Sequence, residues 1–131
     1  MEENEKEAFL HDWVVEEIQK RYSKEFNEIQ TNTTEKKLHS IEGQYPDIIF
    51  GNYGQVVMIG EVETISNINS SSTDKWKSLQ AIGYNCILFV PKQSLKQVRE
   101  LCFENKLIER MKISSASDEI PIKSNTSFQF S

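Results

Sequence analysis

Apolar residues recur at steps of three and four along the first part of the chain, which predicts an amphipathic helix over residues 5–22. The residues of this stripe are Phe9, Leu10, Trp13, Val14 and Ile18. A weak strand candidate follows at residues 26–29, and residues 31–34 have the composition of a turn or loop. The chain therefore begins with an amphipathic helix, a short strand and a loop.

The clearest pattern lies between residues 45 and 63. Residues 45–50 form an apolar strand with Pro46 near its start, where a strand tolerates proline. Gly51-Asn52-Tyr53-Gly54 has the chemistry of a hairpin turn, and residues 56–63 form the returning strand. Because the returning strand is apolar on both faces until its end, we expect it to be central in a sheet covered on both sides.

The second half of the chain alternates helices and strands. Residues 64–73 are rich in Ser and Asn and predict a mobile loop. After it come a helix capped by Thr73 or Asp74 and closed by Gly83, a strand at 86–90, a helix at 93–106 and a last strand at 107–113. This order predicts an α/β fold, a mixed central β-sheet flanked by helices, in one domain over residues 1–113 with a polar tail at 114–131.

The composition suits a folded domain, because 37% of the 131 residues are hydrophobic and 27% are charged. No apolar run approaches the roughly 20 residues that span a bilayer, and the acidic start is unlike a secretory signal. We therefore expect a cytoplasmic protein without membrane contact. Cys86 and Cys102 lack CxxC or paired-His spacing, and we interpret both as core residues rather than a disulfide or a zinc site.

The net charge of −5 argues against tight, non-specific binding to phosphates. The charge is unevenly distributed, since residues 1–7 alone carry −3. Asp47, Glu61 and Glu63 carry a further −3, so the rest of the chain sums to about +1. A divalent cation bound by these three acids would offset most of their charge. The acidity therefore does not exclude nucleic acid as a partner.

Asp47, Glu61 and Glu63 are the candidate site. Side chains alternate across a strand, so Glu61 and Glu63 share one face, and a turn near Gly54 places Asp47 opposite Ile59 or Glu61 on that face. Three carboxylates this close repel one another, and a divalent cation would relieve that cost. Oxygen ligands favour Mg²⁺, Mn²⁺ or Ca²⁺ over zinc.

Acids at the end of a strand can also simply lie in solvent, and for a lone pair of acids we would favour that interpretation. Here Ile49, Val57 and Ile59 precede the acids on the same face. The acids therefore continue a buried stripe instead of an exposed one, which favours a functional site.

Pro46-Asp47, then thirteen residues, then Glu61-Val62-Glu63 resembles the PD-(D/E)xK signature of restriction-endonuclease-like and Holliday-junction-resolvase-like nucleases. The order of elements over roughly residues 8–106 is similar to the αβββαβ core of that superfamily. The resemblance implies a metal-dependent DNA phosphodiester hydrolase, an endonuclease or a resolvase, with Mg²⁺ or Mn²⁺ as cofactor. Many nucleases of this fold dimerise, so a homodimer is a further expectation.

By that resemblance, Asp47, Glu61 and the backbone carbonyl of Val62 ligate the metal. Glu63 stands where the family usually has lysine; it could accept a proton from the attacking water or ligate a second metal. A glutamate cannot supply the positive charge of a lysine. The alternative function is therefore a catalytically inactive nuclease-fold protein that acts as a binding or assembly module. A third alternative is a small α/β protein whose acids merely resemble the motif.

Other residues are candidates by position. The resemblance implies a catalytic polar residue on the helix after the motif, and Gln80 would fill that role unless it simply faces solvent, with Lys77 on the same helix. An acid on the first helix can also contact the metal in this family, and the sequence does not decide between Asp12, Glu16 and Glu17. We interpret His11 and His39 as surface or partly buried polar residues. The candidates for phosphate contact are Lys36, Lys37, His39, Lys75 and Lys77.

Overall fold

The computed structural model describes residues 3–107 and 109–116, so most of the predicted tail, residues 117–131, lies outside the described residues. The regular elements are α1 (Glu3–Tyr22), β1 (Glu28–Thr31), β2 (Ile48–Asn52), β3 (Gln55–Val62), α2 (Ser72–Ala81), β4 (Asn85–Val90), α3 (Leu95–Glu104) and β5 (Met111–Ser115), with the 3-10 turns η1 (Ile65–Asn67) and η2 (Lys92–Ser94). Each predicted element is present in the predicted order. The last strand lies later than predicted, at Met111–Ser115 instead of residues 107–113.

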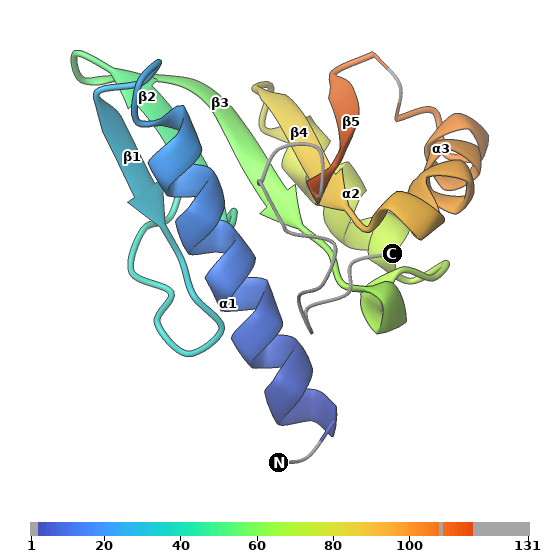
Figure 1. Ribbon diagram of the computed structural model, residues 1–131. Helices are drawn as coiled ribbons and strands as arrows, with labels where there is room; N and C mark the ends of the chain where they lie inside the picture. Colours follow the sequence, from blue (N-terminus) through green and yellow to red (C-terminus); the bar gives the residue numbers. More distant parts are fainter. Residues whose placement is uncertain (1–2, 108, 117–131) are drawn as a thin grey trace.

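The five strands form one mixed sheet in the order β1-β2-β3-β4-β5. The first three strands are antiparallel, and β4 and β5 continue the sheet parallel to β3. Figure 1 shows α1 running across one face of this sheet, with α2 and α3 on the other side. The prediction of an α/β fold with β3 at the centre of a mixed sheet is confirmed.

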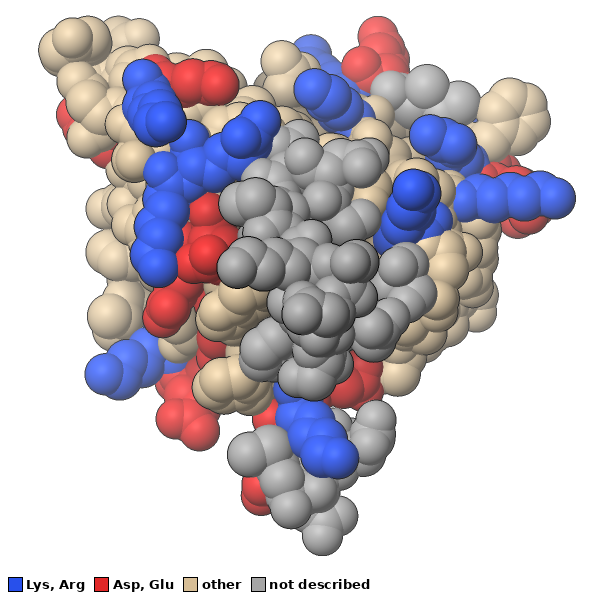
Figure 2. Space-filling view, viewed as in Figure 1, with Lys and Arg blue, Asp and Glu red and all other residues tan. Residues whose placement is uncertain are grey.

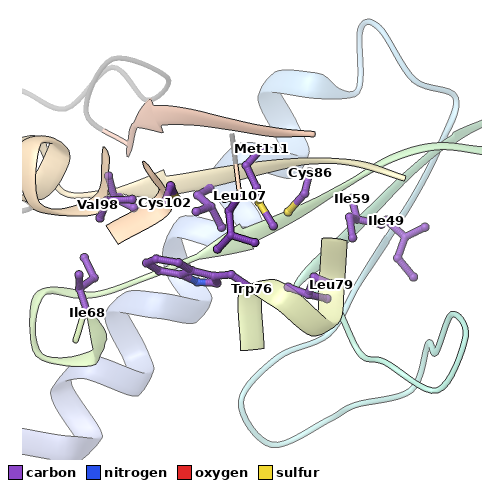
Figure 3. Packing of buried hydrophobic residues seen from close by; sticks show 12 residues of the cluster. Ile49, Ile59, Ile68, Trp76, Leu79, Cys86, Val98, Cys102, Leu107 and Met111 are labelled. Carbon is purple, nitrogen blue, oxygen red and sulfur yellow. The ribbon is translucent and has the colours of Figure 1, made fainter. Parts of the chain in front are cut away.

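Alternate residues of the strands build a separate core on each face of the sheet. Val14, Val15 and Ile18 of α1 pack on Ile48, Phe50, Ile87 and Phe89. On the other face Trp76 packs with Leu79, Leu88 and Val98, as Figure 3 shows for the residues around Trp76. Cys86 and Cys102 belong to this second core, as predicted. Within the described ranges, none of the helices is long and apolar enough to cross a membrane.

The β2–β3 hairpin contains a bulge that the sequence pattern did not predict. Phe50 pairs with Met58 but Gly51 pairs with Val56, so Val57 has no partner in the register. Val57 was expected in the buried stripe, and this was wrong: 46% of the residue is exposed. An extra residue in one strand shifts the alternation of the side chains between the two faces of the sheet. Past the bulge, Ile59 is buried on the predicted face.

The Ser- and Asn-rich segment was predicted to be a mobile loop, but its hydrogen bonds fold it locally. It contains η1, and α2 already begins at Ser72, ahead of the predicted caps. The Ser72 hydroxyl donates to the carbonyl of Asn67, and the backbone N–H of Asn69 donates to the Ser72 hydroxyl. Ile68 is buried in the second core. Short polar side chains bond to nearby backbone groups in such turns, so a polar composition does not by itself mean disorder.

Candidate functional site

The three predicted carboxylates converge at one end of the sheet. Asp47 directly precedes β2, Glu61 lies in β3, and Glu63 directly follows it. Ile48 pairs with Gly60, and continuing this register places Asp47 opposite Glu61. The exposed fractions of Asp47, Glu61 and Glu63 are only 3%, 0% and 4%. The acids therefore form a buried cluster at the point where the two helical layers meet the end of the sheet.

Two reciprocal hydrogen bonds hold Asp47 and Glu61 against each other. The backbone N–H of Asp47 donates to Glu61 Oε1 at 2.9 Å. The backbone N–H of Val62 donates to Asp47 Oδ2 at 2.8 Å. The Glu61 carboxylate thus accepts from the backbone of Asp47, and the Asp47 carboxylate accepts from the backbone next to Glu61. These bonds replace part of the solvation that the carboxylates lose on burial.

Lys75 of α2, which the sequence predicts only as a phosphate contact at the border of the site, reaches the cluster itself. Its Nζ lies 2.6 Å from Glu61 Oε2 and 3.3 Å from Glu63 Oε1. Half of the Lys75 side chain is exposed, so its stem runs along the surface while its ammonium group meets the buried acids. Burial opposes the charge on Lys75, but the carboxylates of Glu61, Glu63 and Asp47 outweigh it and raise the lysine pKa.

The cluster has fewer cations than acids. Burial, and then repulsion from Asp47, raise the pKa of Glu61 to about 8 despite the adjacent Lys75. Burial also raises the pKa of Glu63. One lysine shared between two buried glutamates leaves a deficit of positive charge, which a proton or a metal cation can make up.

His11 of α1 pairs with the third acid. Its Nε2 lies 3.0 Å from Asp47 Oδ2, and its Nδ1 lies 2.8 Å from Asp12 Oδ1. Asp12 Oδ1 also accepts hydrogen bonds from the backbone N–H and the hydroxyl of Thr34, at 3.0 Å and 2.9 Å. The first-helix acid that reaches the site is therefore Asp12, through His11. His11 is partly buried, as expected, but it belongs to the cluster.

The charge of His11 depends on Asp47. Burial opposes protonation, but the hydrogen bond and negative charge of Asp47 outweigh it and raise the His11 pKa to about 9. The same interactions outweigh burial for Asp47 and lower the pKa of that carboxyl. The two groups therefore form an ion pair at neutral pH.

The His11–Asp47 pair predicts a pH-dependent stability. The folded-state pKa of about 9 lies above the ordinary 6.5, so the contribution of His11 is complete below pH 6.5 and is lost as pH rises through about 9. Glu61 lowers the stability over a range that begins at a lower pH. Because its pKa is about 8 in the folded state and ordinarily 4.5, the free energy of unfolding falls as pH rises from 4.5 to about 8. We expect urea unfolding to show a falling free energy across both ranges. His11→Gln should flatten only the upper part; an unchanged curve in that variant would contradict the ion pair.

The loop at 32–46 is fixed by a buried side chain. Asn32 is fully buried and donates from Nδ2 to the carbonyls of His39 and Pro46, at 2.7 Å each. Its Oδ1 accepts from the backbone N–H of His39 at 2.8 Å. With the Thr34 bonds to Asp12, these contacts hold the loop against α1. His39 contributes backbone groups here rather than a ligand.

A cleft of about 330 Å³ opens beside the cluster, between α1, this loop and η1. Its lining includes Asp47, His11 and Lys75 together with Lys37 of the loop and Asn67 of η1. Of the three acids Asp47 lines this cleft, and the lining also carries Glu7 and the two lysines.

Gln80 and the remaining candidates do not join the cluster. Gln80 lies more than a turn beyond Lys75 on α2, and its Oε1 is buried without a hydrogen-bond partner. It makes no hydrogen bond to the three acids, and we assign it no role. Glu17 pairs with Lys20 at 2.9 Å. Among the described residues, neither Glu16 nor Lys77 forms an ion pair with the cluster.

The oxygens of Asp47 and Glu61 are of the kind that binds a hard cation. Both hydrogen bonds to the Asp47 carboxylate go to Oδ2, which leaves Oδ1, whereas the buried Glu61 Oε2 is in contact with Lys75 Nζ at 2.6 Å. Among the described residues, no group of three or more His, Cys, Asp or Glu side chains is arranged so that it could hold a metal ion. The oxygens of Asp47 and Glu61 nevertheless suit Mg²⁺ or Mn²⁺. Binding requires Lys75 Nζ to move away from Glu61 Oε2.

The functional assignment rests on these residues alone. No protein-family model, curated protein or solved structure matches this chain. The surface adds one constraint, because Figure 2 shows Lys and Arg side chains interspersed with Asp and Glu on the face it presents, without a continuous basic surface among the described residues. The described residues of that face therefore give no support to an extended, non-specific nucleic-acid interface.

Proposed function

We propose that this protein is a metal-dependent DNA phosphodiester hydrolase similar to the PD-(D/E)xK nucleases. The observation that carries the proposal is the position of Lys75, whose Nζ lies 2.6 Å from Glu61 and 3.3 Å from Glu63. A lysine from α2 thus supplies the positive charge that Glu63 cannot. The order α1, β1, β2, β3, α2, β4 also supports the proposal, since it agrees with the αβββαβ core of that superfamily.

The proposed roles follow from position and charge. Asp47, Glu61 and the carbonyl of Val62 would hold Mg²⁺ or Mn²⁺, which supplies a Lewis acid and lowers the pKa of a bound water. Lys75 offsets negative charge that develops on the phosphate. Glu63 accepts a proton from the attacking water, and burial raises its pKa, which makes it a stronger base than an exposed glutamate.

Lys37 is the proposed phosphate contact outside the cluster. It lines the cleft with Asp47 and Lys75, on a loop that buried Asn32 holds in place. Contacts of this kind position the backbone of DNA and do not read its sequence. We therefore propose a substrate chosen by structure or by an end rather than by a long recognition sequence.

A cleavage assay tests this proposal. We expect Mg²⁺- or Mn²⁺-dependent cleavage of at least one of supercoiled, linear and branched DNA, abolished by a chelator. Glu61→Ala should remove the activity, while Glu16→Gln, an exposed change on α1, should keep it within about twofold. If no substrate is cleaved by the unmodified protein in either metal, the proposal is wrong.

A binding module without catalysis is the second candidate. It is favoured by the two internal cations, since His11 pairs with Asp47 and Lys75 pairs with Glu61 and Glu63. A cluster held by these two cations and by protonation of a glutamate would be structural. This function predicts that neither Mg²⁺ nor Mn²⁺ changes the thermal stability, whereas the hydrolase is stabilised by its metal.

A further inference from the structure

An apolar groove lies between α3 and β5. It has a volume of about 410 Å³, and the buried Cys102 and Met111 and the half-buried Ile113 form its floor. Phe103 stands at its margin with 72% of its surface exposed. No residue that lines this groove lines the cleft beside Asp47. An exposed aromatic side chain next to an apolar groove is typical of an interaction surface.

The charges on α3 show what kind of surface fits the groove. Lys96 and Arg99 precede Glu100 and Glu104 along the helix, and all four residues are exposed. None of them forms an ion pair with another described residue. This order is unfavourable for an isolated helix. Its cations lie towards the positive N-terminal end of the helix dipole, and its anions lie towards the negative C-terminal end.

A second α3 helix running in the opposite direction complements this pattern. It would bring its acidic end beside Lys96 and Arg99, and its basic end beside Glu104. The two helix dipoles would then also be antiparallel, so that opposite ends lie together. Such self-complementarity is the property that a two-fold symmetric interface requires.

We propose that a second copy of this chain covers the groove in a two-fold symmetric dimer, with the two α3 helices antiparallel. Phe103 of each protomer enters the groove of its partner. Arg99 pairs with Glu104 of the partner subunit, and the symmetry makes this pair twice. The contact buries the exposed phenyl rings at its centre and leaves the charges at its margin, as in other stable protein interfaces.

Sedimentation equilibrium of the full chain tests the dimer. We expect a monomer–dimer equilibrium that Phe103→Glu shifts to monomer at every concentration. Tyr53→Glu is the matched control, since Tyr53 is an aromatic residue with 87% of its surface exposed on the β2–β3 turn, and this variant should dimerise like the unmodified chain. A chain that is monomeric throughout overturns the proposal, whether the groove is empty or filled by another segment.

A charge exchange tests the antiparallel arrangement itself. Arg99→Glu and Glu104→Arg should each weaken the dimer about tenfold, because each places like charges together twice. The double variant restores opposite charges and should return the dissociation constant to within about threefold of the original. Two single effects that simply add in the double variant would overturn this arrangement. Neither measurement depends on metal or DNA, so its result is independent of the proposed hydrolase activity.

Discussion

Replacing Lys75 with methionine is expected to reduce DNA cleavage by about 10²–10³-fold, the loss typical of removing one charge-stabilising group from an active site. Methionine keeps most of the apolar stem on α2, but it leaves the buried Glu61 and Glu63 without their cation, so a loss of stability is expected beside the loss of cleavage. The lost ammonium group lies 2.6 Å from Glu61 and 3.3 Å from Glu63. Single-turnover cleavage rates, with circular dichroism as the check on folding, measure the effect.

A second substitution separates a chemical role of Lys75 from a merely structural one. Adding Glu63→Lys to the methionine variant returns a lysine to the cluster from the strand side, where the PD-(D/E)xK signature usually has it. We expect the rate to recover only in part, because the same change removes the Glu63 carboxylate that accepts the proton from the attacking water. Lys77→Met is the control on the same helix and should change little. Full activity in the Lys75→Met variant would show that the lysine takes no part in cleavage.

Asp47→Asn is expected to lower cleavage by at least about 10³-fold, because it removes a charged metal ligand whose stabilisation of the transition state amounts to several kcal/mol. The same change weakens the charge-assisted bond with His11 and relieves the repulsion of Glu61. We therefore expect the free energy of unfolding to fall by only about 1–2 kcal/mol.

Nuclear magnetic resonance titration of His11 gives an independent measure of the Asp47 change. The His11 pKa should fall from about 9 towards its ordinary 6.5 when Asp47 loses its charge. Asp12→Asn is the matched control: it alters the other side of the same imidazole and leaves Asp47 in place, so cleavage should stay within about tenfold. A His11 pKa that does not move in Asp47→Asn would contradict the ion pair.

Much of the fold could be predicted from local patterns. The hairpin at residues 45–63 shows alternating side chains, a Gly-rich turn and two apolar strands, and these fix the convergence of Asp47, Glu61 and Glu63. The boundaries were less accurate. The bulge at Val57 left no mark in the sequence, because the residue is apolar whether it is buried or exposed.

The cations of the site could not be predicted in the same way. His11 is 36 residues from Asp47, and Lys75 is 12 residues from Glu63, so the contacts depend on how α1 and α2 pack on the sheet. Charge and burial offered only an indirect signal. Three buried acids need positive partners, and a search for basic residues on the helices that flank the motif would have included both. Gln80 was chosen by resemblance alone, and α2 places Lys75 at the acids instead.

Titration calorimetry with Mn²⁺ tests the central claim, that Asp47 and Glu61 form a site for a divalent cation. The unmodified protein should give a saturable binding signal at neutral pH. Asp47→Asn and Glu61→Gln should lose that signal, while Glu16→Gln should retain it. The absence of saturable binding by the unmodified protein, or equal binding by all three variants, would contradict the claim and leave the acid cluster as a structural element closed by His11 and Lys75.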